Sequence, residues 1–82
     1  MTATEQTARD ERARVARARL AAAEMRVRAA DQDRRAAAYT GQASHPIYAG
    51  QAEHCLLEAA QVGAMADVTR ARADLIEAEA GL

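Results

Sequence analysis

Three side chains in this sequence are suited to metal binding or nucleophilic chemistry, namely His45, His54 and Cys55. A protein zinc site usually takes four ligands, drawn from closely spaced pairs of Cys or His. His54 and Cys55 are adjacent, so on a helix they point about 100° apart, and only Glu58 shares a face with His54. A metal ion would need ligands from a second chain, so we expect no metal site and no bound cofactor.

Catalytic patterns are missing from the sequence. There is no Gly-rich phosphate loop, no G-x-S-x-G turn and no Glu-x-x-His pair of the kind that builds di-iron sites. A single cysteine on an apolar helix face is more often a packing residue than a nucleophile. We therefore expect a protein that is not an enzyme, with the roles of both histidines and of Cys55 left open.

Arginine supplies all eleven basic residues of the chain. Arg12, Arg19 and Arg26 recur every seven residues, so they form one stripe along a helix, and helical arginines can contact phosphate groups. The acidic residues interleaved with the arginines cancel much of their field, and no aromatic side chains accompany them for base stacking. Nucleic-acid contact through these three arginines is therefore the less favoured interpretation.

The composition favours long helices. Alanine contributes 24 of the 82 residues, the sequence has no Phe or Trp, and its only proline is Pro46. Residues 1–40 carry nine arginines against six acids, whereas residues 51–82 carry two against six. Segments of opposite charge attract each other when the chain folds back. The sequence predicts an all-α fold in which two long antiparallel helices form a hairpin.

Capping signals set the expected helix boundaries. Thr2 followed by Glu5 is typical of a capping box, although Thr4 is an equally plausible cap. Gly41 is placed to end the first helix, and Gly81 is placed to end the second. Pro46 suits the first turn of a second helix, although Gly50 could mark a later start. The expected layout is a single domain over 1–82, with one helix over about 3–39, a turn over about 40–45 and a second helix over about 46–80.

Each expected helix carries two apolar stripes rather than one, with the alternating three- and four-residue spacing of coiled coils. On the first helix, one stripe follows Ala13, Ala16, Leu20, Ala23, Val27 and Ala30, and the other follows Ala8, Val15, Ala18, Ala22, Met25, Ala29, Ala36 and Tyr39. On the second helix, one stripe follows Ile47, His54, Leu57, Gln61, Ala64, Val68, Ala71, Leu75, Ala78 and Leu82, and the other follows Tyr48, Ala52, Cys55, Ala59, Val62, Ala66, Thr69, Ala73, Ile76 and Ala80.

A two-helix hairpin buries only one stripe on each helix, so the second stripe predicts additional neighbours. We expect Ala-rich, coiled-coil-like packing, completed by oligomerisation as a bundle of roughly four or more helices. The alternative is that one stripe faces solvent, because exposed alanine is common. The residues expected at the protein interface are Val15, Leu20, Met25, Val27, Tyr39, Ile47, Tyr48, Leu57, Val62, Val68, Leu75 and Ile76.

These features favour a non-enzymatic structural or assembly subunit that packs into a homo-oligomer or a larger multi-subunit particle. A small accessory protein of a phage particle or shell fits by class, since no motif identifies a family. One alternative is a dimeric, arginine-surfaced regulator that binds nucleic acid or a regulatory protein, and another is a subunit that stabilises a partner such as an enzyme. The sequence shows no signal peptide and no membrane-spanning segment, so we expect a protein that does not bind membranes and lies in the cytoplasm or within an intracellularly assembled particle.

Overall fold

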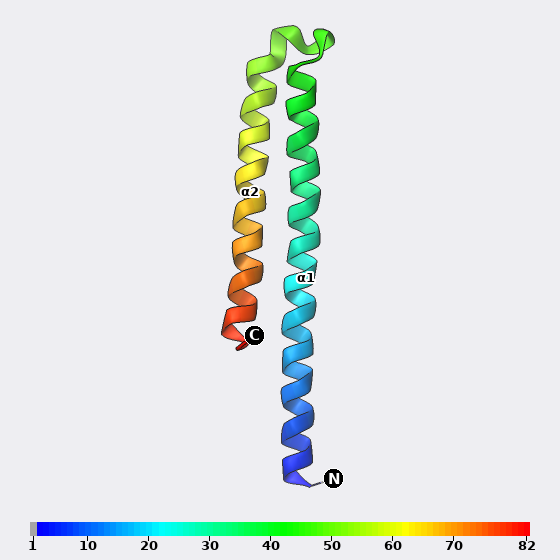
Figure 1. Cartoon of the computed structure of the whole chain (residues 1–82), viewed down its shortest axis with the longest axis vertical. Helices are drawn as coiled ribbons and strands as arrows, with labels where there is room; N and C mark the ends of the chain where they lie inside the picture. The colour runs from blue at the N-terminus through cyan, green and yellow to red at the C-terminus, as the bar shows by residue number, and fades with distance from the viewer. Residues whose placement is uncertain (1) are drawn as a thin grey trace.

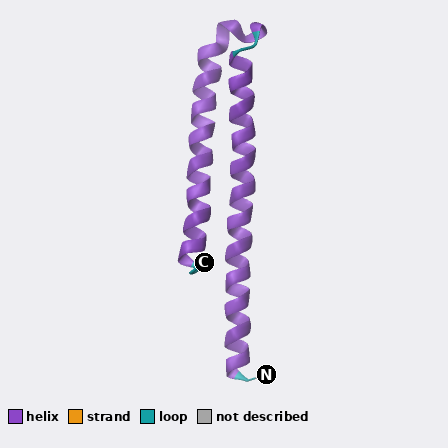
Figure 2. Ribbon diagram, viewed as in Figure 1, coloured by secondary structure: helices purple, strands orange, loops and turns teal. Residues whose placement is uncertain are grey.

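The chain folds into a long helical hairpin in the computed structural model, which describes residues 2–82. Helix α1 spans Ala3–Ala43 and helix α2 spans Ala52–Glu79, and the two run antiparallel (Figure 1). A short 3₁₀ helix, η1, covers Pro46–Gln51 at the tip of the hairpin. Within the described residues there is no strand (Figure 2). The predicted all-α hairpin of two antiparallel helices is confirmed.

The hairpin is a thin rod rather than a compact domain. Its principal extents are 69 × 16 × 11 Å and its radius of gyration is 19.6 Å, whereas a compact domain of this length would have a radius of about 12 Å. Helix α1 has 41 residues against 28 for α2. Its N-terminal portion therefore extends beyond the end of α2 with no helix beside it (Figure 1).

Both outer ends of the hairpin carry the caps that the sequence predicts. The Thr2 hydroxyl accepts a hydrogen bond from the Glu5 backbone N–H at 3.1 Å, and the Glu5 carboxylate accepts one from the Thr2 N–H at 3.0 Å, which completes a capping box. At the other end, Gly81 adopts φ 78° and the Leu82 N–H donates to the Glu77 carbonyl at 2.8 Å. That left-handed conformation favours glycine and ends α2.

The tip of the hairpin differs from the sequence prediction at the end of the first helix. Helix α1 continues through Gly41 to Ala43, so the prediction that Gly41 ends it near Tyr39 is wrong. Ala43 lies four residues after Tyr39, on the same helix face, and is half-buried. The extra turn therefore adds packing that outweighs the low helix propensity of glycine.

The second helix begins later than the favoured prediction placed it. Residues Pro46–Gln51 form η1, and Tyr48 at φ −104° and ψ 15° breaks the helical path before α2 starts at Ala52. The alternative start near Gly50 was closer to the structure. The His45 side chain accepts a hydrogen bond from the Ile47 N–H at 3.2 Å, and this contact holds the first turn of η1.

The contact between α1 and α2, here called the inner seam, is built mainly from small side chains. It follows Val15, Ala18, Ala22, Met25, Ala29, Gln32, Ala36, Tyr39 and Ala43 on α1 and Ala52, Cys55, Ala59, Val62, Ala66, Thr69, Ala73, Ile76 and Ala80 on α2, all of them buried or half-buried. Eight described residues are buried, and five of these are alanine. Small residues at a helix contact let the two backbones approach closely.

One polar pair lies inside this seam. The Thr69 hydroxyl oxygen is 2.9 Å from both the Gln32 side-chain oxygen and the Met65 carbonyl oxygen, and Gln32 and Thr69 are both buried. A hydroxyl has one proton, so it donates to only one of these oxygens at a time. If the Gln32 amide turns over, its NH₂ group donates to Thr69 while Thr69 donates to Met65, so the hydroxyl accepts one hydrogen bond and donates one.

We expect Thr69→Val to destabilise the hairpin, because it leaves the buried Gln32 amide without its partner. An unsatisfied buried polar group costs about 1–3 kcal/mol, and urea unfolding followed by circular dichroism at fixed protein concentration would measure the loss. The double variant Gln32→Leu/Thr69→Val should recover most of it, because both polar partners are then gone. A double variant as unstable as the single one would contradict this account.

Candidate functional site

The structure separates the residues that the sequence assigned to a protein interface into two groups. One group lies within the hairpin, on the inner seam or, for Tyr48, in η1: Val15, Met25, Tyr39, Tyr48, Val62 and Ile76. The other group faces away from the hairpin and is exposed: Leu20, Val27, Ile47, Leu57, Val68 and Leu75. The hairpin thus accounts for the first group by itself and leaves the second without a neighbour.

Apart from Ile47, which lies in η1, the exposed group belongs to two apolar stripes on the outer sides of the hairpin. The outer stripe of α1 consists of Ala13, Ala16, Leu20, Ala23, Val27 and Ala30. The outer stripe of α2 consists of Leu57, Gln61, Ala64, Val68, Ala71, Leu75, Ala78 and Leu82. Leu20 and Val27 are 61% and 68% exposed, and the large residues of the α2 stripe are between 46% and 57% exposed. The α1 stripe covers residues 13–30, and the longer α2 stripe covers residues 57–82.

The hairpin exposes more surface than its mass requires. A folded monomer of this size is expected to expose about 4,800 Å², and the hairpin exposes 5884 Å². The excess approaches the total area that a small specific protein interface buries, about 1,200 Å². Two apolar stripes and an unusually large surface together identify the sides of the rod as the candidate interaction site.

Two exposed apolar residues escaped the sequence prediction. Leu56 and Met65 are both 53% exposed, and neither falls in phase with a stripe. Each occupies a helix position that flanks the inner seam, and in coiled coils these flanking positions are usually charged. Their size and apolar character were the only signals that could have singled them out.

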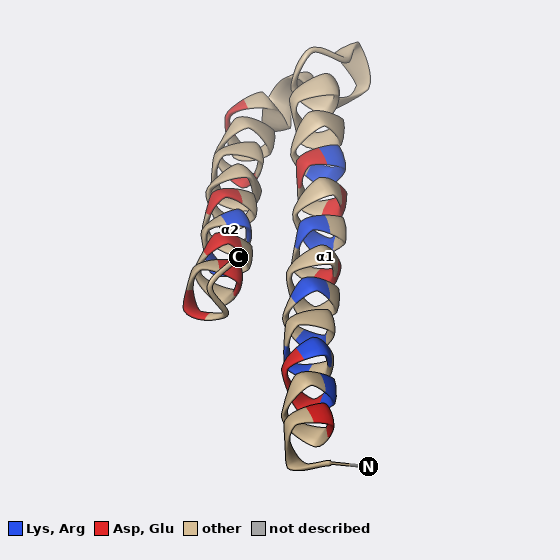
Figure 3. Ribbon diagram, turned by 60° about the horizontal axis from the view of Figure 1, so that its bottom comes forward, with Lys and Arg blue, Asp and Glu red and all other residues tan. Residues whose placement is uncertain are grey.

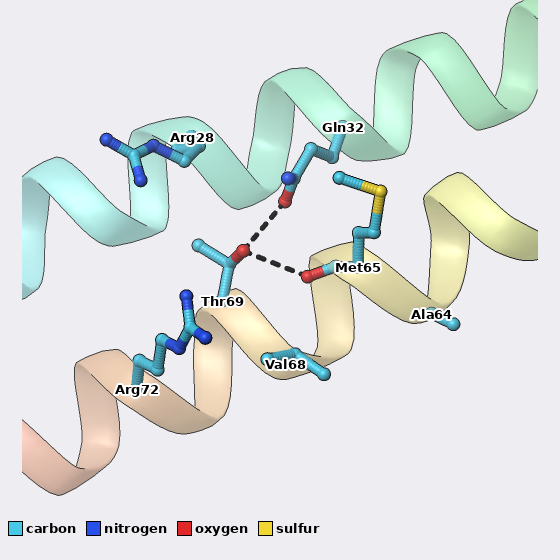
Figure 4. Close-up of a pocket in the computed structure, with 7 residues that line it drawn as sticks. All are labelled: Arg28, Gln32, Ala64, Met65, Val68, Thr69 and Arg72. Atoms are coloured by element: carbon cyan, nitrogen blue, oxygen red, sulfur yellow. Dashed lines mark hydrogen bonds between the residues drawn. The ribbon is translucent and has the colours of Figure 1, made fainter.

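An open groove beside the outer stripe of α2 gathers apolar and basic side chains (Figure 4). Met65 and Val68 line it together with the buried Gln32–Thr69 pair, and Arg28 and Arg72 lie toward one end. Neither arginine forms an ion pair with any residue in the described part of the chain. The groove therefore offers two free guanidinium groups next to an apolar face.

Ion pairs bridge the two helices on the opposite flank from this groove. Arg26 contacts Asp74 at 3.1 Å and also Glu77, and Arg70 contacts Asp33 at 2.6 Å. These hydrogen-bonded carboxylates raise the pKa of Arg26 and of Arg70. The pairs are exposed, so each adds little stability, but they fix which residues of α1 and α2 lie side by side.

Local pairs on α1 depress the pKa of two acidic residues. The hydrogen bond from Arg14 lowers the pKa of Glu11, and the hydrogen bond from Arg35 lowers the pKa of Asp31. A carboxyl group with a lowered folded-state pKa stabilises the fold above its unfolded-state pKa, and this contribution is lost as the pH falls through the lowered value. Stability from these pairs is therefore present at neutral pH and lost in acid.

The arginine stripe predicted from the sequence does not act as one unit. Arg26 is engaged with α2, whereas Arg12 and Arg19 are exposed and form no ion pair with residues 2–82. Acidic and basic residues alternate along α1, and acidic residues predominate on α2 (Figure 3). The α1 surface presents isolated cations rather than a continuous basic patch.

The three residues considered for metal or nucleophilic chemistry are dispersed. Cys55 is buried with its sulfur 3.9 Å from the Gln42 side-chain oxygen, His54 lies 3.9 Å from Glu58 on the surface, and His45 caps η1. Across residues 2–82 no three His, Cys, Asp or Glu side chains are grouped as metal ligands would be. No described helix combines the length and apolar character needed to cross a membrane.

Comparison of the chain with protein-family models, with curated proteins and with solved structures finds no match.

Proposed function

We propose that this protein is a non-enzymatic assembly subunit whose hairpin packs against other copies through its outer stripes. The observation that carries this proposal is the pair of exposed apolar stripes, which present Leu20, Val27, Leu57, Val68 and Leu75 to solvent. A side chain such as Leu75 gains about 1.5–3 kcal/mol when it moves fully out of water. The stripes therefore hold stabilisation that the hairpin alone does not use.

The composition of the inner seam supports the same proposal. Its fully buried residues are mainly alanines, and burial of a methyl group contributes only about 0.8 kcal/mol, whereas ordering a residue costs about 1.5 kcal/mol. A single hairpin of this kind gains little from its own core. Packing of further copies onto the outer stripes completes the burial, so an assembly of several hairpins is the stable form. Membership of a larger particle would extend this packing to other proteins.

We expect the purified chain to be oligomeric, with a melting temperature that rises with protein concentration. Assembly links folding to concentration because only the folded form associates. Sedimentation velocity, together with thermal melts by circular dichroism over a wide concentration range, measures both quantities. A folded monomer whose melting temperature does not change with concentration would contradict the proposal.

The free arginines of α1 favour a second candidate, a dimeric helical regulator that binds nucleic acid. Arg12 and Arg19 are exposed and unpaired among the described residues, and Arg12 lies in the part of α1 that extends beyond α2. Fluorescence anisotropy with generic duplex DNA at low and high salt tests this candidate, because phosphate contacts weaken steeply with salt. Binding that weakens in this way, and that Arg12→Ala and Arg19→Ala reduce, would support it.

A further inference from the structure

We propose that the outer stripe of α1 packs against the outer stripe of α2 of the next copy, so that hairpins line up side by side in an open row. The inference rests on the proposed assembly function and specifies which surface meets which. Four features support it: the directions of the stripes, the sizes of the facing side chains, the flanking charges, and the poor fit of a symmetric α2–α2 contact.

The directions of the stripes argue against a closed four-helix bundle. On each helix the outer stripe lies roughly 150° around from the inner seam, at about 100° per residue, whereas a helix in a closed four-helix bundle meets its two neighbours about 90° apart. The faces between the stripes carry charged residues, including Arg26 and Asp33 on α1 and Arg70 and Glu77 on α2. Neighbours therefore lie on nearly opposite sides of each helix.

The two stripes also lean in opposite directions, so the row does not curve into a small ring. The outer stripe of α1 leans toward the flank of the Arg26–Glu77 pair, and that of α2 leans toward the flank of Arg72 and Met65. The row therefore bends toward one flank at each α1 and toward the opposite flank at each α2, so the two bends cancel. A head-to-tail contact that does not close produces an extended assembly.

The register of the hairpin makes the two stripes complementary in size. The contacts Arg26–Glu77, Gln32–Thr69 and Gln42–Cys55 fix this register between α1 and α2. The same antiparallel register between neighbouring copies places Leu20 opposite Ala78, Ala23 opposite Leu75, and Ala30 opposite Val68. Val27 and Ala71 form another layer of the same kind. Every layer pairs one large aliphatic side chain with one alanine, which fills space without overpacking.

The charges that flank the stripes are complementary as well. In this register Arg19, which forms no ion pair with residues 2–82, faces Asp74 of the neighbouring copy, and Arg26 faces its Asp67. Both acids already pair within their own hairpin, with Arg26 and Arg70, but their side chains remain 76% and 77% exposed and can accept a second cation. On the other edge of the contact, Asp31 faces Arg72, which has no ion pair within the described hairpin. One like-charged pair, Glu24 with Glu79, runs against the pattern. Opposite charges at the rim favour this pairing over others.

A symmetric contact between two α2 stripes is less suitable. With Leu57 opposite Leu75, a twofold antiparallel contact would place Glu58 beside Glu79 and Glu53 beside Asp74. With Leu57 opposite Leu82, Asp67 and Arg72 would each lie beside their own symmetry mate. A contact between two α1 stripes would likewise bring arginines such as Arg19 together. The charge distribution therefore favours the pairing of unlike helices.

Cysteine cross-linking of the full chain tests the proposal. The variants would carry Cys55→Ala to remove the native thiol, together with Ala23→Cys, Leu75→Cys or both. Positions 23 and 75 lie on opposite outer sides of one hairpin, so they cannot bridge within a chain. Under mild oxidation we expect neither single variant to cross-link, their mixture to give a covalent dimer, and the double variant to give a ladder of dimers, trimers and larger species.

The outcomes separate this inference from the assembly function on which it rests. A covalent dimer from Leu75→Cys alone would show an α2–α2 contact and overturn the proposal. Absence of cross-links in every combination, with the native chain still oligomeric by sedimentation, would also overturn it while the assembly function stands. A monomeric native chain would remove both.

Discussion

Val68→Asp is expected to dissociate the assembly, with apparent affinity between copies reduced by about 100-fold or more. The substitution places a carboxylate in the middle of the outer stripe of α2, where a neighbouring copy would bury it. An uncompensated buried charge costs about 3–5 kcal/mol, and each 1.4 kcal/mol is a tenfold change in affinity. Sedimentation velocity of the variant and of the native chain at equal concentrations measures the effect.

Leu56→Asp is the matched control for this prediction. Leu56 and Val68 lie on the same helix and are 53% and 52% exposed, so the two changes remove similar apolar surface. Leu56 lies on the flank away from the outer stripe, and the charge there stays in water. Assembly should survive Leu56→Asp. If both variants dissociate the oligomer alike, or neither does, the outer stripe of α2 is not the contact.

The overall fold was predictable because several local signals agree. Alanine and arginine favour helix along the whole chain, Thr2 and Glu5 form the expected cap, and Gly81 ends α2 in the conformation that glycine adopts most easily. Net charges of opposite sign on the two halves suggested that the chain folds back, and Arg26 and Arg70 make such pairs between the helices. Local propensity and long-range charge point to the same hairpin.

The choice between the two stripes of each helix could not be made from periodicity. Both stripes on α2 carry similar numbers of large aliphatic residues, so an apolar count does not rank them. The structure buries the stripe with alanine at the closest points of approach, such as Ala66 and Ala73. It also buries Gln32, which an apolar pattern omits and which depends on Thr69 across the seam. A pairwise contact of this kind is not visible in either helix alone.

The tip of the hairpin was the least predictable part of the fold. Gly41 is a common helix-ending residue, but α1 continues past it because Gln42 and Ala43 extend the contact with α2 near Cys55. Pro46 begins a 3₁₀ segment rather than α2 itself. The position of a helix end depends on a small free-energy difference between local propensity and packing, and at the end of α1 packing is the larger contribution.

Replacement of Ala66 with leucine is expected to destabilise the hairpin by about 1–3 kcal/mol, the usual cost of overpacking a close contact. Ala66 is fully buried in the inner seam, three residues before Thr69, and its methyl group sets how closely the helices approach. A leucine there would force the backbones apart along several turns and separate the Gln32–Thr69 pair. Urea unfolding by circular dichroism, at matched concentration and compared with the native chain, measures this loss.

Ala60→Leu provides the matched control, because Ala60 lies on the exposed side of the same helix. The two substitutions add the same atoms and have the same helix propensity, so they differ only in whether the added side chain has room. Ala60→Leu should leave stability nearly unchanged. If Ala66→Leu were equally harmless, the inner seam would have space for larger residues. The alanines would then not be what holds the two helices at close distance, and the same reasoning for alternating large and small layers between copies would fail with it.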